Sequence, residues 1–251
     1  MKTLATPLWL VSLLSAAFIS QAHAQTDLYT VDMSNVLTGS WSSSPDNVLT
    51  LDFGNGLGTG SITFTSINNG FFAPGAINYT GEPYEAELLN GDTLHRDNET
   101  TFSLRATAPD HPGLQGFTMS VALDEGMFPA GSVFLIRSLD NRPDGNIQRI
   151  ELVSGLEAPT ADIHPSDFGG ATGTLIEISP GMYASDAVGS VSRGAIIPIK
   201  ATGNSFTVNF LANSSYNGGI AFAIATPVVP EPTAGLLAGI AGLGLAFRRR
   251  R

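Results

Sequence analysis

Ser205-Phe206-Thr207-Val208-Asn209-Phe210-Leu211 is the stretch of the sequence that most clearly indicates the fold. Apolar side chains stand at every second position, with polar ones between them. A β-strand has this period because successive side chains point to opposite faces, whereas a helix would space its apolar residues three and four apart. We therefore predict a half-buried strand, with Phe206, Val208 and Phe210 on its buried face.

Similar segments recur along most of the chain. They are rich in Val, Ile, Phe and Thr, and Gly, Pro, Asn and Asp separate them, as is typical of tight turns. No strong apolar stripe at helical spacing occurs before the C-terminal tail. We predict an all-β domain, an antiparallel β-sandwich that is jelly-roll-like. Its predicted strands are residues 28–33, 48–53, 61–66, 100–106, 117–123, 133–138, 147–153, 174–179, 195–200, 205–211 and 219–225.

The N-terminus has the pattern of a secretory signal peptide. Lys2 supplies a positive start, residues 8–19 form a compact apolar core, and Ala22-His23-Ala24 is a small-x-small cleavage site. We therefore predict that signal peptidase removes residues 1–24 and that the mature chain begins at Gln25.

The C-terminus carries three elements in order. Pro230-Glu231-Pro232 comes first, an uncharged apolar run over residues 234–247 follows, and Arg248, Arg249, Arg250 and Arg251 end the chain. A helix over residues 233–247 would be about 22 Å long, which is short for a permanent membrane anchor. The arginines are expected on the cytoplasmic side, so the rest of the chain is expected across the inner membrane. A plain tail anchor is the alternative interpretation.

This tail resembles the PEP-CTERM sorting signal of Gram-negative bacteria, on the residues just named. The resemblance implies that exosortase, a membrane cysteine peptidase, recognises the tail and cuts near the Pro-Glu-Pro motif. It further implies transient anchoring in the inner membrane, then transfer to the cell surface or the exopolysaccharide matrix. We expect three parts: a signal peptide (1–24), an exported β-sandwich domain (25–226) and the sorting tail (227–251).

The charge of the chain excludes some partners. The whole sequence has 12 basic and 22 acidic residues, a net charge of −10. The predicted exported domain keeps seven of the basic and 21 of the acidic residues, which gives −14. Nucleic-acid binding needs a basic surface, so we exclude it. Since the chain has no cysteine, the domain must fold without disulfides.

The sequence contains no recognisable catalytic motif. Outside the predicted signal peptide its histidines are His95, His111 and His164, and we interpret His95 and His164 as loop residues beside solvated acids. Neither a Gly-x-Ser-x-Gly elbow in a strand-to-helix setting nor a His-Glu-x-x-His motif occurs. We predict a non-enzymatic protein, and a hydrolase with an unrecognised site is the remaining enzymatic alternative.

Calcium is the one cofactor that the sequence suggests. Asp140, Asp144 and Asn146 lie in a short segment between two predicted strands and would offer the oxygen ligands that Ca²⁺ prefers. Asp and Asn also favour turns for backbone reasons alone, so an ordinary turn is the competing interpretation.

Two non-enzymatic functions remain open. The first is a structural surface or matrix protein. The second is a carbohydrate-binding module, for which Trp41, Phe71 and Phe72 are candidate ligand-binding residues because they lie in segments expected to form loops. A buried loop plug is the alternative role for the two phenylalanines.

Overall fold

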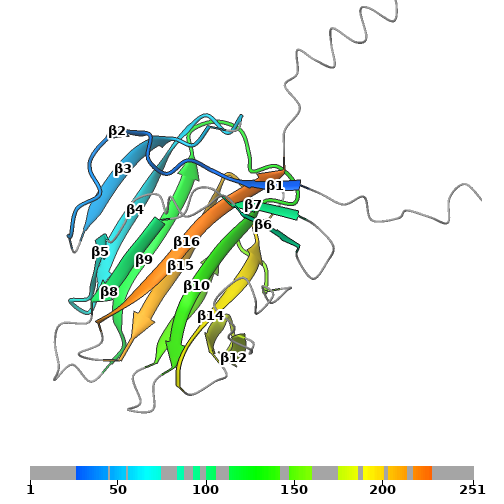
Figure 1. Cartoon of the computed structure of the whole chain (residues 1–251). Helices are drawn as coiled ribbons and strands as arrows, with labels where there is room; N and C mark the ends of the chain where they lie inside the picture. The colour runs from blue at the N-terminus through cyan, green and yellow to red at the C-terminus, as the bar shows by residue number, and fades with distance from the viewer. Residues whose placement is uncertain are drawn as a thin grey trace, which may run out of the picture.

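The computed structural model describes residues 27–44, 46–54, 56–74, 84–87, 93–96, 100–105, 113–141, 147–159, 175–185, 189–200, 203–213 and 217–227. Regular structure in these residues consists of β-strands, with no helix among them. The prediction of an all-β fold is confirmed for this part of the chain. The strands form two sheets, which we call sheet A and sheet B (Figure 1).

Sheet A contains the first and the last strand of the described chain. Across the sheet the order is β14 (Gly189–Pro198), β10 (Val133–Asn141), β16 (Asn217–Pro227), β1 (Asp27–Thr30), β7 (Thr93–Arg96) and β6 (Tyr84–Glu87), with β8 (Thr100–Arg105) also beside β16 and β5 (Phe71–Pro74) beside β8.

Sheet B is a continuous antiparallel sheet of eight strands. Its order is β12 (Leu175–Ser179), β13 (Met182–Ser185), β11 (Gln148–Ser154), β15 (Ser205–Ala212), β9 (Gln115–Leu123), β4 (Thr59–Ile67), β3 (Asn47–Asp52) and β2 (Val36–Thr38).

The alternating stretch from Ser205 to Leu211 lies in β15, near the middle of sheet B. Phe206, Val208 and Phe210 have no exposed surface, as predicted, and Thr207 and Asn209 point to the other face. β15 pairs with β9 over its full length and with β11 on its other side. The strand is therefore covered on one face only, which is why its sequence alternates.

One pair of strands departs from the antiparallel prediction. β1 runs parallel to β7, with Leu28 opposite Leu94, while the other described pairs are antiparallel. A parallel pair needs a long connection between its strands, and more than sixty residues separate β1 from β7. Local turn signals cannot reveal such a pairing.

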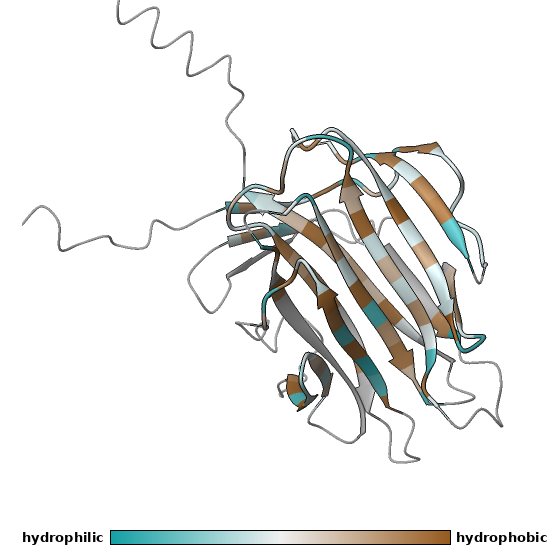
Figure 2. Ribbon diagram, turned by 180° about the vertical axis from the view of Figure 1, so that it is seen from behind, coloured by the Kyte–Doolittle hydropathy of each residue, from teal (hydrophilic) through white to brown (hydrophobic). Residues whose placement is uncertain are grey.

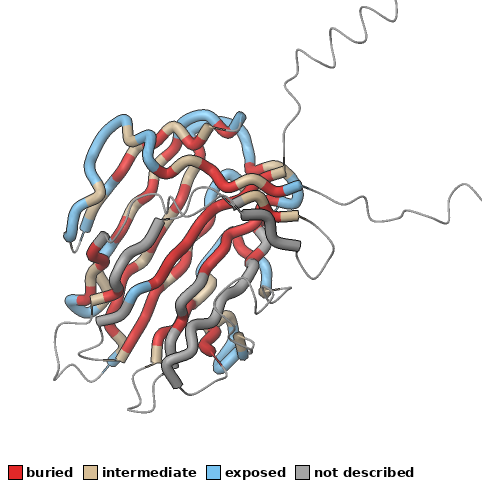
Figure 3. The backbone as a smooth tube through the Cα atoms, in the orientation of Figure 1, coloured by how far each residue is buried: buried red, intermediate tan, exposed pale blue. Residues whose placement is uncertain are grey.

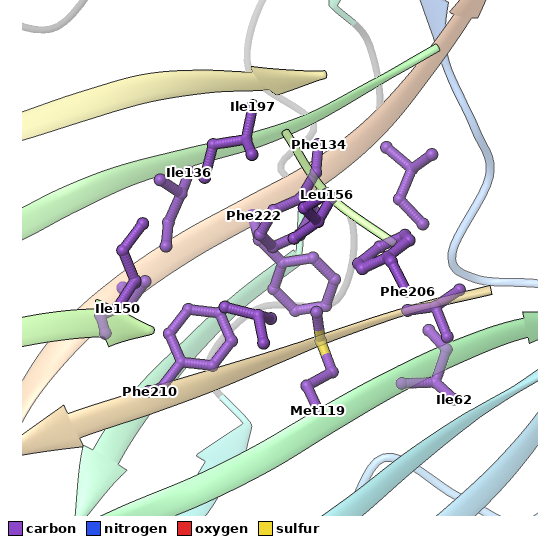
Figure 4. Close-up of a cluster of buried hydrophobic side chains, with 14 of the residues drawn as sticks. Ile62, Met119, Phe134, Ile136, Ile150, Leu156, Ile197, Phe206, Phe210 and Phe222 are labelled. Carbon is purple, nitrogen blue, oxygen red and sulfur yellow. The ribbon is translucent and has the colours of Figure 1, made fainter. Parts of the chain in front are cut away.

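The two sheets pack face to face around a core rich in phenylalanine. In Figure 4, Phe134 and Phe222 from sheet A meet Phe206 and Phe210 from sheet B. The rings of Phe134 and Phe206 have centroids 5.2 Å apart. Such aromatic pairs contribute about 0.5–1.5 kcal/mol beyond the area they bury. This core supports the interpretation of the fold as a sandwich.

Candidate functional site

The base of the predicted sorting tail lies at one corner of the sandwich. β16 ends at Pro227, one residue beyond the boundary that we predicted for the domain. Pro227 is opposite Leu28 of β1, and Figure 1 shows the start of β1 beside the end of β16. The tail itself, from residue 228, lies outside the described residues, as do Ala22, Ala24 and Gln25 at the predicted signal cleavage site.

A short loop over residues 124–132 covers this corner, and we call the surface around it the tail end of the sandwich. The loop joins β9 of sheet B to β10 of sheet A. A Cβ added at Gly131 would lie 3.4 Å from Cγ of Pro227, so the loop passes close to the last residue of β16. Figure 3 shows how far each residue is buried. Most residues of the loop are exposed.

Hydrogen bonds hold the loop in place. The Asp124 N–H donates to the carbonyl of Thr59 (3.0 Å), and the Thr59 hydroxyl donates to Oδ2 of Asp124 (2.7 Å). The Phe128 N–H donates to the carbonyl of Gly203 (3.1 Å), and the Phe128 ring is buried against Phe206. The loop is therefore held at Asp124 by Thr59 and at Phe128 by Gly203. Met127, between these anchors, has 60% of its surface exposed.

The tail end is acidic in the residues that the structure describes. Its acidic side chains belong to Asp27, Asp52, Asp124, Glu125 and Glu157, and its lysine is Lys200. The segment 155–157 belongs to this surface because the Lys200 N–H donates to the carbonyl of Gly155 at 3.0 Å. Five carboxylates against one lysine give the described part of this corner a net negative charge.

His95 is part of strand β7, and our interpretation of it as a loop residue is wrong. Its ring stacks on Tyr29, with centroids 4.3 Å apart and planes within 9° of each other. Its Nε2 lies 3.6 Å from Oδ1 of Asp27. Within the described ranges no three His, Asp or Glu side chains gather as a metal site. His111 and His164 lie outside those ranges.

The described residues do not test the calcium prediction. Asp140 belongs to β10, while Asp144 and Asn146 lie outside the described residues. A calcium site in this segment stays a prediction. It is checked by whether calcium at about 1 mM, the range of extracellular calcium modules, raises the unfolding temperature.

The three aromatic ligand-binding candidates do not form an exposed platform. Phe72 is 1% exposed and stacks on Phe64, with ring centroids 3.9 Å apart. Trp41 is partly buried against the core, and its Nε1–H donates to the carbonyl of Met33 at 3.1 Å. Phe71 is half-buried in β5. Phe72 is therefore a core residue, and the segment expected to be a loop is a strand.

Sequence reasoning missed an array of hydroxyl and amide side chains on the outer face of sheet B. Figure 2 shows this sheet from outside, with hydrophobic and hydrophilic residues alternating along its strands. The outward residues of its central strands are Ser61, Thr63, Thr65, Thr118, Ser120, Thr207 and Asn209. The signal was available, since these residues occupy alternate positions of three predicted strands.

Lateral hydrogen bonds connect this array across three strands. The Thr118 hydroxyl donates to Oδ1 of Asn209 (2.8 Å), whose Nδ2 donates to Oε2 of Glu151 (2.7 Å). The hydroxyls of Ser120 and Thr207 are 3.0 Å apart. These bonds hold the side chains in defined rotamers, so the array presents a preorganised polar surface.

Two groups of sheet B have displaced pKa values. Burial lowers the pKa of Arg149, whose Nη1 donates to Oδ1 of Asn213 at 2.6 Å. Burial raises the pKa of Tyr183, and the nearby carboxylate of Glu177 raises it further. Both groups lie on the β11–β13 side of the sheet, away from the tail end.

Comparison with known families identifies the tail. A family model described as the PEP-CTERM protein-sorting motif matches residues 228–251. The chain carries this sorting motif. The match covers the tail only, and it begins at the residue that follows β16.

The remaining comparisons add no relative. Neither the search of curated proteins nor the search of solved structures found a match. In the described part of the chain, no helix is long and apolar enough to cross a membrane. The motif implies export, membrane transit and processing by exosortase.

Proposed function

We propose that the chain is an exported surface or matrix protein without enzymatic activity. In this proposal the sandwich is the exported domain, and the tail is its sorting signal. Signal peptidase removes the N-terminal segment, the tail holds the chain in the inner membrane for a time, and exosortase then passes it to the cell surface or the exopolysaccharide matrix.

The position of the motif carries this proposal. A recognised sorting motif begins immediately after the last described strand of a folded sandwich. The described part of the sandwich has an aromatic core of its own and a loop held by hydrogen bonds at this corner. Such a body can be released as a unit once the tail is processed.

The test is to replace Pro230, Glu231 and Pro232 by alanine in the full chain, expressed in a host that has an exosortase. The variant should stay in the inner-membrane fraction as a precursor, whereas the wild-type chain leaves that fraction. Val48→Ala, at an exposed position of β3, is the control and should be sorted normally. Equal release of the triple variant and the wild type would contradict the proposal.

The absence of enzymatic activity is tested separately. The processed protein should give no turnover with polysaccharides, esters or phosphates. Turnover that survives purification and disappears on unfolding would favour the hydrolase alternative instead.

Carbohydrate binding is the second candidate function, and the hydroxyl array of sheet B favours it. Thr118, Ser120 and Thr207 lie on neighbouring strands about 4.8 Å apart. Hydroxyl and amide groups fixed by one another are suited to hydrogen bonding with the hydroxyls of an uncharged glycan. This array therefore replaces Trp41, Phe71 and Phe72 as the candidate glycan-binding surface.

Affinity electrophoresis in gels containing an uncharged polysaccharide tests this candidate. The double variant Thr63→Val and Thr65→Val exchanges two hydroxyls for methyl groups while keeping β-branched side chains. If the array binds glycan, this variant should migrate faster than wild type, and Thr93→Val on β7 of sheet A should not. Equal migration of all three proteins with and without polysaccharide would remove the candidate.

A further inference from the structure

We propose that the tail end of the sandwich is a docking surface for the peptidase that processes the tail. The surface consists of the loop 124–132 with Asp27, Glu157 and Pro227. The inference rests on the proposed sorting function, and it assigns part of the recognition to the folded domain.

The length of the connecting chain carries the argument. Only residues 228 and 229 separate Pro227, the last residue of β16, from Pro230. Three residue steps span at most about 11 Å even when the chain is fully extended. A peptidase that engages Pro230-Glu231-Pro232 must therefore come within that distance of Pro227. Since an enzyme is several times larger than this gap, it meets the surface around Pro227.

The pairing of β16 with β1 opposes any unfolding of the end of β16 that would lengthen the connection to Pro230. Pro227, Thr226 and Ala225 are each paired with a residue of β1, and the Val31 N–H donates to the carbonyl of Ile224 at 2.8 Å. Thr226 and Ala225 have no exposed surface. Freeing these residues would cost buried area as well as backbone hydrogen bonds. The folded corner therefore stays in place while the tail is handled.

The exposed side chains of the tail end indicate which kind of partner surface it would bind. Glu125 and Glu157 are exposed, and the 60%-exposed Met127 lies between the anchored ends of the loop. An exposed apolar side chain on a surface with more carboxylates than lysines is suited to a small apolar contact with a basic rim. The same carboxylates disfavour adhesion to anionic lipid headgroups. The occupant that fits is the periplasmic face of the peptidase.

The test is a cycle of two changes in the full chain, read as the rate at which precursor becomes processed protein in a pulse-chase experiment. The first change is Glu125→Lys with Met127→Ser. The second inserts twelve Gly/Ser residues between Pro227 and Val228, which extends the average reach by about 20 Å. Ile178→Ser with Ser179→Lys, at exposed positions of the edge strand β12, is the control for the same kinds of substitution.

At the native tail length, Glu125→Lys with Met127→Ser should slow processing at least about threefold, the size of effect that exposed charges give. Ile178→Ser with Ser179→Lys should process at the wild-type rate. With the spacer inserted, the loop substitutions should lose their effect because the corner no longer meets the enzyme. Unfolding midpoints of all variants are measured so that a folding defect is recognised.

Two results would overturn the proposal. Processing at the wild-type rate in the loop variant would show that the corner makes no useful contact. Faster processing on insertion of the spacer alone would show that the corner only obstructs the enzyme. Failure of sorting itself is distinguishable, because the chain with alanine in place of Pro230-Glu231-Pro232 would then behave like wild type.

Discussion

Leu28 and Pro227 lie opposite each other in the antiparallel ladder of β1 and β16, so the first strand of the sandwich holds the residue that precedes the sorting motif. Leu28 is also paired with Leu94 of β7 and is 2% exposed. The two ends of the described chain are thus joined at one corner. Anything that loosens β1 also loosens the base of the tail.

Leu28→Ala should therefore destabilise the protein by about 2–5 kcal/mol, the usual cost of removing a buried leucine side chain. Leu37→Ala is the control, because Leu37 in β2 is 52% exposed and should cost less than about 0.5 kcal/mol. Urea unfolding of the two variants and the wild type measures both values. Equal midpoints for the two variants would contradict the role of Leu28.

Phe71 and Phe72 are neighbours in β5 with different roles. Phe72→Ala should cost about 3–5 kcal/mol, because the ring is buried against Phe64 and Phe117. Phe71→Ala should cost less than half as much, since Phe71 is only partly buried. Thermal unfolding compares them. A larger loss for Phe71→Ala would show that the assignment of Phe72 to the core is wrong.

Gly155 and Gly126 have nearly the same backbone angle, with φ of +70° and +76°, but different surroundings. A Cβ on Gly155 would lie 2.2 Å from the carbonyl oxygen of Ser205, whereas a Cβ on Gly126 would meet no atom within 4 Å. Gly126→Ala should cost about 1–2 kcal/mol for the left-handed angle alone. Gly155→Ala should cost clearly more, and chemical denaturation measures the difference. Equal costs would mean that the backbone at Gly155 relaxes freely.

Tyr183 should make the protein sensitive to alkaline pH. Its pKa is raised in the folded state, so between pH about 10 and the folded-state pKa the unfolded chain binds fewer protons than the folded one. The contribution of Tyr183 is fully present below pH 10 and decreases as the pH rises above it. Tyr183→Phe should flatten this decrease, and Glu177→Gln should reduce it in part because Glu177 is one of its causes.

Urea midpoints measured from pH 8 to pH 12 check this expectation. Glu177→Gln keeps an oxygen that can accept the hydrogen bond from the Gly181 N–H, so the turn between β12 and β13 is preserved. An unchanged pH profile in Tyr183→Phe would contradict the assignment.

Much of the fold and of the sorting motif could be predicted from the sequence, because both depend on local patterns. The alternation in Ser205–Leu211 predicts β15 and its buried face from seven residues. The tail is recognisable because Pro230, Glu231 and Pro232 precede an apolar run and four arginines. The strands β5 and β7 escaped prediction since Phe71–Pro74 and Thr93–Arg96 are too short to show a period.

What the sequence by itself determined is the all-β character of the described chain, the acidity of the whole sequence and the presence of the sorting motif. Only the tertiary structure decided which strands became neighbours: β1 lies between β16 and a parallel β7, and Phe72 lies in the core instead of on the surface. The physical reason is that side-chain alternation is set by residues two positions apart. Strand partners are selected by contacts between residues far apart in the chain, such as Leu28 and Pro227, whose value depends on how the whole core packs.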